Sequence, residues 1–89
     1  MIRQPVTIIN KLGLHARAAA KLVETASAFE SRVLLAKGDR EVDAKSIMPV
    51  MMLAASQGTE VELAADGPDE QEAIAALEAL INDYFGEGQ

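Results

Sequence analysis

The order of apolar and polar residues along the 89-residue chain predicts four short strands. Residues 6–9 are mostly β-branched and predict the first strand, and residues 32–37 predict the second. The Gly-Asp pair that follows predicts a two-residue turn, from which 40–43 returns as the antiparallel partner. Apolar and acidic residues alternate in 59–64, so this strand is expected to have one buried side and one side in water.

Three other segments have apolar residues at helical spacing. The first helix is expected to begin directly after His15, the second at Ser46 with Pro49 in its first turn, and the third after a Gly-Pro-Asp sequence. The second helix is expected to stop by Gly58 and the third at Gly86. The apolar stripes of the three helices are Ala19, Leu22, Val23, Ala26 and Phe29, then Ile47, Val50, Met51 and Ala54, and finally Ala73, Ile74, Leu77, Leu80 and Ile81.

The resulting order of elements, β-α-β-β-α-β-α, predicts an α+β fold close to the split βαβ pattern. Three helices of this length are expected to cover one face of a four-stranded antiparallel sheet, which makes an open-faced β-sandwich. Glu60 and Glu62 on the last strand place the other face in water. Residues 1–89 are expected to form a single domain. The face that meets the helices is expected to carry Val6, Ile8, Val33, Leu35, Val61 and Leu63.

Charge is distributed unevenly along the chain, whose net charge is −6. Residues 1–40 hold seven Lys or Arg against three Asp or Glu, a net of +4, and residues 41–89 hold one against eleven, a net of −10. A basic region on an acidic body suits an anion or an acidic partner. The overall acidity and the scarcity of aromatic residues argue against nucleic-acid binding.

The chain has no cysteine and a single histidine. These counts exclude a thiolate metal site and a multi-histidine metal site, so no metal and no cofactor are expected. No apolar run approaches the length of a bilayer span, and the N-terminus lacks the pattern of a secretion signal. A cytoplasmic protein that does not insert into membranes is therefore expected.

His15 is the residue most suited to carry chemistry. At the start of a helix, unpaired backbone amides and the helix dipole attract anions and disfavour a protonated imidazole. A neutral His15 can act as a nucleophile for a phosphoryl group, whose oxygens would meet the amides of Ala16 and Arg17 and the forked guanidinium of Arg17. Lys11 and Lys21 add positive charge nearby. Taken alone, the same histidine also fits a loop or cap residue without chemistry.

Ser46 has two interpretations, and the methionines that follow it are divided between core filling and docking. Serine is a preferred helix N-cap, and beside Lys45 it is also a candidate phosphorylation site whose added charge the helix start favours. Met48 and Met52 lie four positions apart and are expected to be exposed as an adaptable docking surface, whereas Met51 is expected in the core.

Two stretches of the sequence resemble a known family. Residues 13–20 (GLHARAAA) are similar to the active-site stretch of HPr, the phosphocarrier of the bacterial phosphoenolpyruvate-dependent phosphotransferase system, and residues 44–51 (AKSIMPVM) are similar to its regulatory serine stretch. The segment 66–70 and the closing helix fit as well, so the resemblance spans nearly the whole chain. Ala18 stands where most members have proline, and Pro49 stands where glycine is common. The alanine-rich stretch also occurs in the nitrogen-branch relative NPr, so the sugar and nitrogen branches both stay open.

The resemblance implies an open-faced β-sandwich that works as a phosphocarrier and not as an enzyme. It implies that His15 accepts a phosphoryl group from phosphorylated enzyme I, with help from Arg17, and donates it to a histidine of an enzyme II A-domain. It also implies phosphorylation of Ser46 in organisms that have an HPr kinase/phosphorylase.

A docking surface for these partners is expected to combine Lys21 and Lys45 with Met48 and Met52 on a monomer. Two other functions remain open on the residues alone. One is a small regulatory anion-binding module of ferredoxin-like topology, with the anion at the helix end that carries Arg17. The other is a small hydrolase of acyl phosphates on a similar fold.

Overall fold

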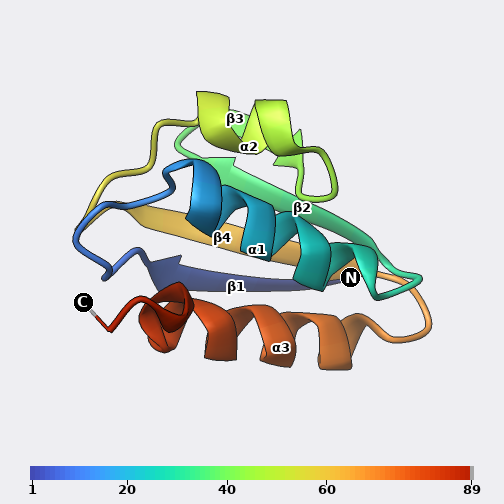
Figure 1. The fold of residues 1–89 in the computed structure, drawn as a ribbon. Coiled ribbons are helices and arrows are strands. Elements are labelled where there is room, and N and C mark those ends of the chain that lie inside the picture. The colour runs from blue at the N-terminus through green and yellow to red at the C-terminus, as the bar shows by residue number, and fades with distance from the viewer. Residues whose placement is uncertain (89) are drawn as a thin grey trace.

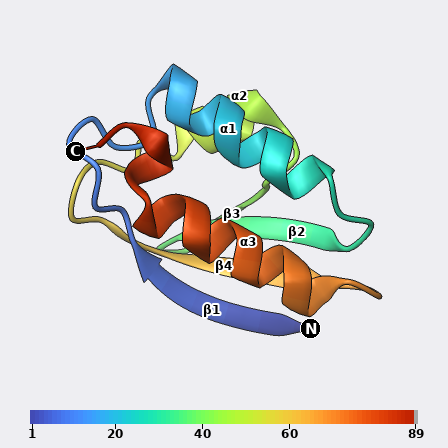
Figure 2. The ribbon, with the colours of Figure 1, turned by 60° about the horizontal axis from the view of Figure 1, so that its bottom comes forward.

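The computed structural model describes residues 1–88 and contains a four-stranded antiparallel sheet with its helices on one face (Figures 1 and 2). The strands, in the spatial order β1-β4-β2-β3, are β1 (Ile2–Thr7), β2 (Arg32–Lys37), β3 (Arg40–Asp43) and β4 (Glu60–Asp66). The helices are α1 (Ala16–Ser27), α2 (Ile47–Met52) and α3 (Glu70–Asn82), followed by the short 3₁₀ helix η1 (Tyr84–Gly86). The predicted α+β open-faced β-sandwich is confirmed.

The core lies between the sheet and the helices. The six residues predicted to face the helices from the sheet are all buried, although Ile8 follows the end of β1. They are Val6, Ile8, Val33, Leu35, Val61 and Leu63. From α1, three alanines and one leucine have no exposed surface, namely Ala18, Ala19, Leu22 and Ala26. The small alanine side chains allow α1 to pack closely against the sheet, as the dense packing of protein interiors requires.

The outer face of the sheet is less solvated than the sequence predicts. Leu34 and Ala64 are register partners that alternate with core residues, so they lie on the outer face, yet both are buried. Arg3 of β1 donates hydrogen bonds to Glu62 of β4 at 2.9 Å and to Glu41 of β3 at 3.2 Å. This ion-pair network reaches from one edge strand to the other across the outer face of the sheet.

β1 covers Ile2–Thr7 and not the predicted 6–9. The polar residues Arg3 and Gln4 gave no strand signal, and Pro5 has no N–H group for the sheet. Proline is tolerated here because β1 is an edge strand. The main-chain pairing continues past the strand, since Ile8 N donates to Thr59 O at 2.9 Å.

The second helix is shorter than predicted. α2 ends at Met52, and Ala54 lies beyond it with φ of 54° and an exposed side chain. Ile47, predicted to face the core, is 39% exposed, whereas Met51 packs partly buried against the core. Six residues make fewer than two helical turns, so the helical spacing does not extend to Ala54.

The other two helices also end earlier than the pattern predicts. α1 ends at Ser27, so Phe29 lies beyond it and is partly buried. α3 ends at Asn82 and not at Gly86, because the chain turns into η1. The remaining residues of the predicted stripes that are only partly buried are Val23 and Leu80. Within residues 1–88, no helix has both the length and the apolar character needed to cross a membrane.

Candidate functional site

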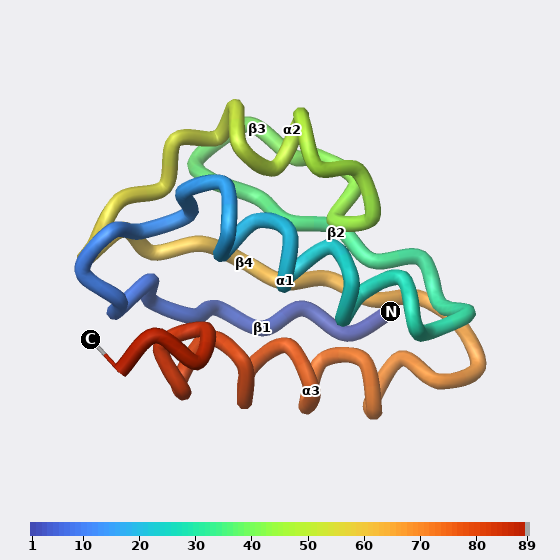
Figure 3. The backbone as a smooth tube through the Cα atoms, viewed as in Figure 1, coloured from blue at the N-terminus to red at the C-terminus, as the bar shows by residue number. Residues whose placement is uncertain are grey.

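His15 is carried by the loop between β1 and α1, which packs against the segment after α2 (Figure 3). Leu14 N donates to Ala55 O at 2.8 Å. Gly13 has φ of +66°, and a Cβ atom at this position would lie 2.6 Å from Ala55 O. Any side chain at residue 13 would clash with the main chain of Ala55 and Ser56, so glycine is required for the close packing that positions the loop before His15.

His15 is the N-cap residue of α1, with φ of −74° and ψ of 177°, and its ring makes no cap hydrogen bond. Helical bonding begins with Ala19 N, which donates to His15 O at 2.8 Å. The amides of residues 16–18 precede this first helical bond, and the side chains of Ala16 and Arg17 are exposed. The helix start predicted to attract an anion is therefore present directly beside the histidine.

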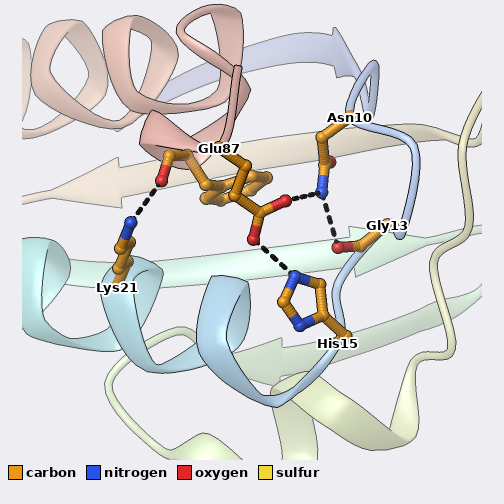
Figure 4. A network of polar contacts seen from close by, with 6 residues as sticks. Asn10, Gly13, His15, Lys21 and Glu87 are labelled. Atoms are coloured by element: carbon orange, nitrogen blue, oxygen red, sulfur yellow. Dashed lines mark hydrogen bonds and ion pairs between the residues drawn. The ribbon is translucent and has the colours of Figure 1, made fainter. Parts of the chain in front are cut away.

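The ring of His15 contacts a residue from the other end of the chain (Figure 4). Its Nε2 lies 2.5 Å from Oε2 of Glu87. The other oxygen of this carboxylate accepts a hydrogen bond from Nδ2 of Asn10 at 3.0 Å, and the same Nδ2 donates to Gly13 O at 2.9 Å. Within the described residues, Nδ1 of His15 has no hydrogen-bond partner, so Glu87 distinguishes the two ring nitrogens.

The charge state of Glu87 decides how this contact is protonated. Burial raises the pKa of the Glu87 carboxyl, but the hydrogen bonds from Asn10 and His15, with the charges of His15 and Lys21, lower the pKa below its ordinary value. An ionised carboxylate contains only acceptor atoms, so Nε2 of His15 supplies the proton of the contact. In the neutral ring this assignment leaves the lone pair on Nδ1.

Glu87 belongs to a strained C-terminal turn, defined as residues 84–88. Tyr84 and Phe85 have φ of 57° and 54°, a conformation that costs roughly 1–3 kcal/mol for each non-glycine residue. The side chain of Phe85 is fully buried, and Nζ of Lys21 donates to Phe85 O at 2.6 Å. These two contacts stabilise the turn and hold Glu87 against the histidine.

A cleft of about 290 Å³ opens beside His15. Its lining residues are Lys11, Leu12, His15, Arg17, Lys21, Gly86 and Glu87. Three cationic side chains against one carboxylate make the cleft attractive to phosphoryl oxygens. Over residues 1–88, no three His, Asp or Glu side chains are grouped to hold a metal ion.

Exposed apolar side chains lie in the cleft and on α2. Leu12, which lines the cleft, is 67% exposed, and the two methionines predicted to be exposed, Met48 and Met52, are 63% and 61% exposed. Met48 and Met52 belong to α2, which lies beside α1 (Figure 1). Their role in docking stays a prediction.

Lys45 and Ser46 are not among the residues that line the cleft. Nζ of Lys45 donates to Phe29 O at 2.7 Å, beyond the C-terminal end of α1. His15 lies at the other end of α1, which is about 18 Å long. The structure therefore does not bring Lys45 beside His15, where the predicted docking surface needs it. Ser46 is the N-cap residue of α2, as predicted, but its side chain makes no cap hydrogen bond.

The sequence gives no signal for Asn10 and Glu87 as site residues. Glu87 is separated from His15 by 72 positions, and no spacing rule links a glutamate near the end of a chain to a histidine near its start. Asn10 is fully buried, and within residues 1–88 its Oδ1 atom has no hydrogen-bond partner. Only the fold, which brings the C-terminal turn against α1, joins these residues.

Comparison with known proteins shows a match of residues 2–83 to the family described as the PTS HPr component phosphorylation site. The phosphocarrier protein HPr of Cupriavidus necator is 61% identical over 89 residues, which cover 100% of both chains. The crystal structure of HPr-C-His from Thermoanaerobacter tengcongensis matches with a TM-score of 0.95 and 52% identity, over 98% of both chains. The crystal structure of an HPr dimer from the same organism matches with a TM-score of 0.79 and 52% identity, over 98% of this chain and 100% of that one.

Proposed function

Because the chain belongs to the HPr family of phosphocarrier proteins, which are carriers and not catalysts, we propose that His15 accepts a phosphoryl group from phosphorylated enzyme I and passes it to a histidine of an enzyme II A-domain. One observation carries this proposal. The ring of His15 lies at the start of α1 in a cleft of cationic side chains, with Nε2 held by Glu87 and Nδ1 without a partner in residues 1–88.

Nδ1 of His15 is the proposed accepting atom. Its lone pair attacks the phosphorus on the donor histidine, in line with the nitrogen that leaves. The new N–P bond forms as the old bond breaks, and the electron pair of the broken bond returns to the donor ring. The proton on Nε2 stays in place, so the His15 ring acquires a positive charge that faces the Glu87 carboxylate. Transfer to the acceptor histidine follows the same course with the roles exchanged.

Charge and position do most of the chemical work in this proposal. The amides of Ala16 and Arg17 lie at the positive end of the helix, and the exposed guanidinium of Arg17 offers a fork of donors to the phosphoryl oxygens. Lys11 and Lys21 complete a cationic wall around the same cleft. These groups stabilise the negative charge of the group in transit without forming covalent bonds to it.

Donor and acceptor must both reach Nδ1, so enzyme I and the enzyme II A-domain are proposed to use one surface in turn. This surface is proposed to consist of the cleft, which includes Leu12, and the exposed residues Met48 and Met52 of α2. Apolar contacts supply binding energy, and the cationic wall attracts an acidic partner. We propose that the protein acts as a monomer and meets these partners in the cytoplasm.

Ser46 is proposed as the site of regulatory phosphorylation by an HPr kinase/phosphorylase. Its hydroxyl is not used as a cap, and a phosphate at the N-cap position of α2 would lie at the end of the helix that tolerates negative charge.

Intact-mass measurement after incubation with enzyme I and phosphoenolpyruvate tests the carrier function. The expected result is one acid-labile phosphate on the unmodified chain and none on His15→Ala. Saturable binding of phosphate without a covalent change would support the anion-sensing module instead. Turnover of acyl phosphate by the chain alone would support the hydrolase. An acid-labile phosphate on His15→Ala would overturn the assignment of His15.

A further inference from the structure

The contact between His15 and Glu87 joins the start of α1 to the C-terminal turn. We infer that Glu87 is a positioning residue that selects the tautomer of His15 whose Nδ1 atom is reactive, and that Asn10 fixes the orientation of the Glu87 side chain. The tautomer part of this inference stands on geometry alone, and its effect on transfer rests on the proposed function of His15.

Asn10 sets the direction of the two hydrogen bonds that its amide group makes. Its Nδ2 group lies between two acceptors, Gly13 O at 2.9 Å and Oε1 of Glu87 at 3.0 Å, so the amide must point its donor group at both (Figure 4). Asn10 is fully buried, which prevents water from supplying a substitute partner at low cost. The atom of residue 87 that faces Asn10 is therefore required to be an acceptor.

The remaining carboxylate oxygen faces His15. Oε2 lies 2.5 Å from Nε2, and because a carboxylate has no proton to give, Nε2 must carry one. The hydrogen bond made by one ring nitrogen decides the protonation of the other. Glu87 thus keeps the Nδ1 lone pair available.

The same carboxylate faces the charge that transfer creates. Attack by Nδ1 leaves a positive charge shared with Nε2, and Glu87 is the one acidic side chain among the residues that line the cleft. The cationic groups facing it are Lys11 and Arg17 in the cleft and Lys21, whose ammonium group is held by Phe85 O. Buried Phe85 and this lysine contact prevent the C-terminal turn from moving the carboxylate away.

Glu87→Gln is the sharpest variant because it keeps the shape of the side chain and changes its donor pattern. Asn10 requires the oxygen of the introduced amide, so the NH₂ group of that amide faces Nε2. Nε2 must then be an acceptor, and the ring proton moves to Nδ1. We expect ¹⁵N chemical shifts of the His15 ring to change from the Nε2–H to the Nδ1–H pattern. We expect the rate of phosphoryl transfer from enzyme I to fall by about tenfold or more.

Glu87→Ala and Glu72→Gln complete the experiment. Glu87→Ala removes the carboxylate without adding a donor, so the ring is expected to become a mixture of tautomers and transfer to fall less than in Glu87→Gln. Glu72→Gln makes the same charge change at an exposed position of α3, and both readouts are expected to stay unchanged. Circular dichroism of each variant measures whether the fold is retained.

The relative transfer rates of Glu87→Gln and Glu87→Ala distinguish a positioning role of Glu87 from a packing role. A role in packing alone predicts that the isosteric Glu87→Gln is the milder change and that the tautomer stays the same, and this result would overturn the inference. The tautomer is measured on the unphosphorylated chain without enzyme I. If the unmodified chain shows the Nε2–H form but takes no phosphate on His15, the proposed function fails and the tautomer assignment stands. If the unmodified chain is labelled but Glu87→Gln keeps the Nε2–H form, the inference alone fails.

Discussion

The hydroxyl of Ser31 lies 2.5 Å from the carboxylate of Asp69, and this contact joins the start of β2 to the start of α3. The same carboxylate accepts hydrogen bonds from Ser31 N and Glu30 N, each at 2.9 Å. Asp69 N in turn donates to Ser31 Oγ at 3.2 Å. Two connections that are 38 positions apart in sequence are therefore tied by one carboxylate.

Asp69→Asn is expected to lower the stability of the fold and to weaken its dependence on pH. The hydrogen bonds from Ser31 and from the main chain of Glu30 hold the pKa of the Asp69 carboxyl below its ordinary value. Its contribution to stability is therefore complete above the pKa of the unfolded chain and is lost as the pH falls through the lower pKa of the folded chain. Thermal unfolding measured from about pH 7 down to about pH 2 is expected to show a smaller decline in Tm for Asp69→Asn than for the unmodified chain.

Asp83→Asn is the control for this series, because Asp83 is an exposed carboxylate at the end of α3. It is expected to reproduce the pH profile of the unmodified chain. Equal profiles for Asp69→Asn and Asp83→Asn would show that the contact with Ser31 does not stabilise the fold.

Gly13→Ala is expected to destabilise the protein by about 3 kcal/mol or more. It combines an unfavourable positive φ with a methyl group placed 2.6 Å from Ala55 O. Gly38→Ala is the matched control, because Gly38 has a similar φ of +61° but open space around the added methyl. Its expected cost is about 1–2 kcal/mol. Urea unfolding of both variants measures the difference, and equal losses would mean that the loop before His15 relaxes freely.

Ser46→Ala is expected to change stability by less than about 0.5 kcal/mol, because the Ser46 side chain makes no cap hydrogen bond. Ser46→Asp is expected to leave the fold intact and to slow phosphorylation of His15 by enzyme I several-fold, since it places a negative charge two positions before Met48 of the proposed docking surface. Ser46→Asn has nearly the same shape without the charge and is expected to transfer at the unmodified rate. Identical initial rates for Ser46→Asp and Ser46→Asn at low salt would refute a charge effect at this position.

Lys11→Gln and Lys45→Gln each remove one positive charge, and the two lysines lie near opposite ends of α1. Lys11 lines the cleft beside His15, whereas Lys45 is bonded to Phe29 O. Association with enzyme I is expected to be slower for Lys11→Gln, with a weaker dependence on salt, and nearly unchanged for Lys45→Gln. Stopped-flow association rates at several salt concentrations measure both quantities. Equal effects of the two substitutions would argue against a basic surface centred on the cleft.

The parts of the fold that follow a clear periodicity are predicted well from sequence. Val61 and Leu63 alternate with glutamates, and both residues are buried on the helical face of the sheet. The first strand is predicted too late in the sequence, at residues 6–9, because the beginning of β1 is polar and contains Pro5, which is tolerated there because β1 is an edge strand. Ile47 was misplaced because a helix of six residues is too short for its apolar spacing to define a buried face.

The residues of the site also differ in whether the sequence predicts them. His15 and Arg17 are visible in the sequence because a helix start beside a histidine has a local pattern. Glu87 is not visible, because its contact depends on a C-terminal turn in which Tyr84 and Phe85 adopt positive φ, and neither residue type favours that conformation. Tertiary burial of Phe85 outweighs the local preference.

The most direct test of phosphoryl transfer to His15 is a ³¹P–¹⁵N coupling measurement on the phosphorylated chain. The protein is labelled with ¹⁵N in its single histidine and incubated with enzyme I and phosphoenolpyruvate. We predict a one-bond coupling between phosphorus and Nδ1 of His15, with the proton retained on Nε2 beside Glu87. Coupling to Nε2, or a stably phosphorylated chain without coupling to either ring nitrogen, would contradict this account.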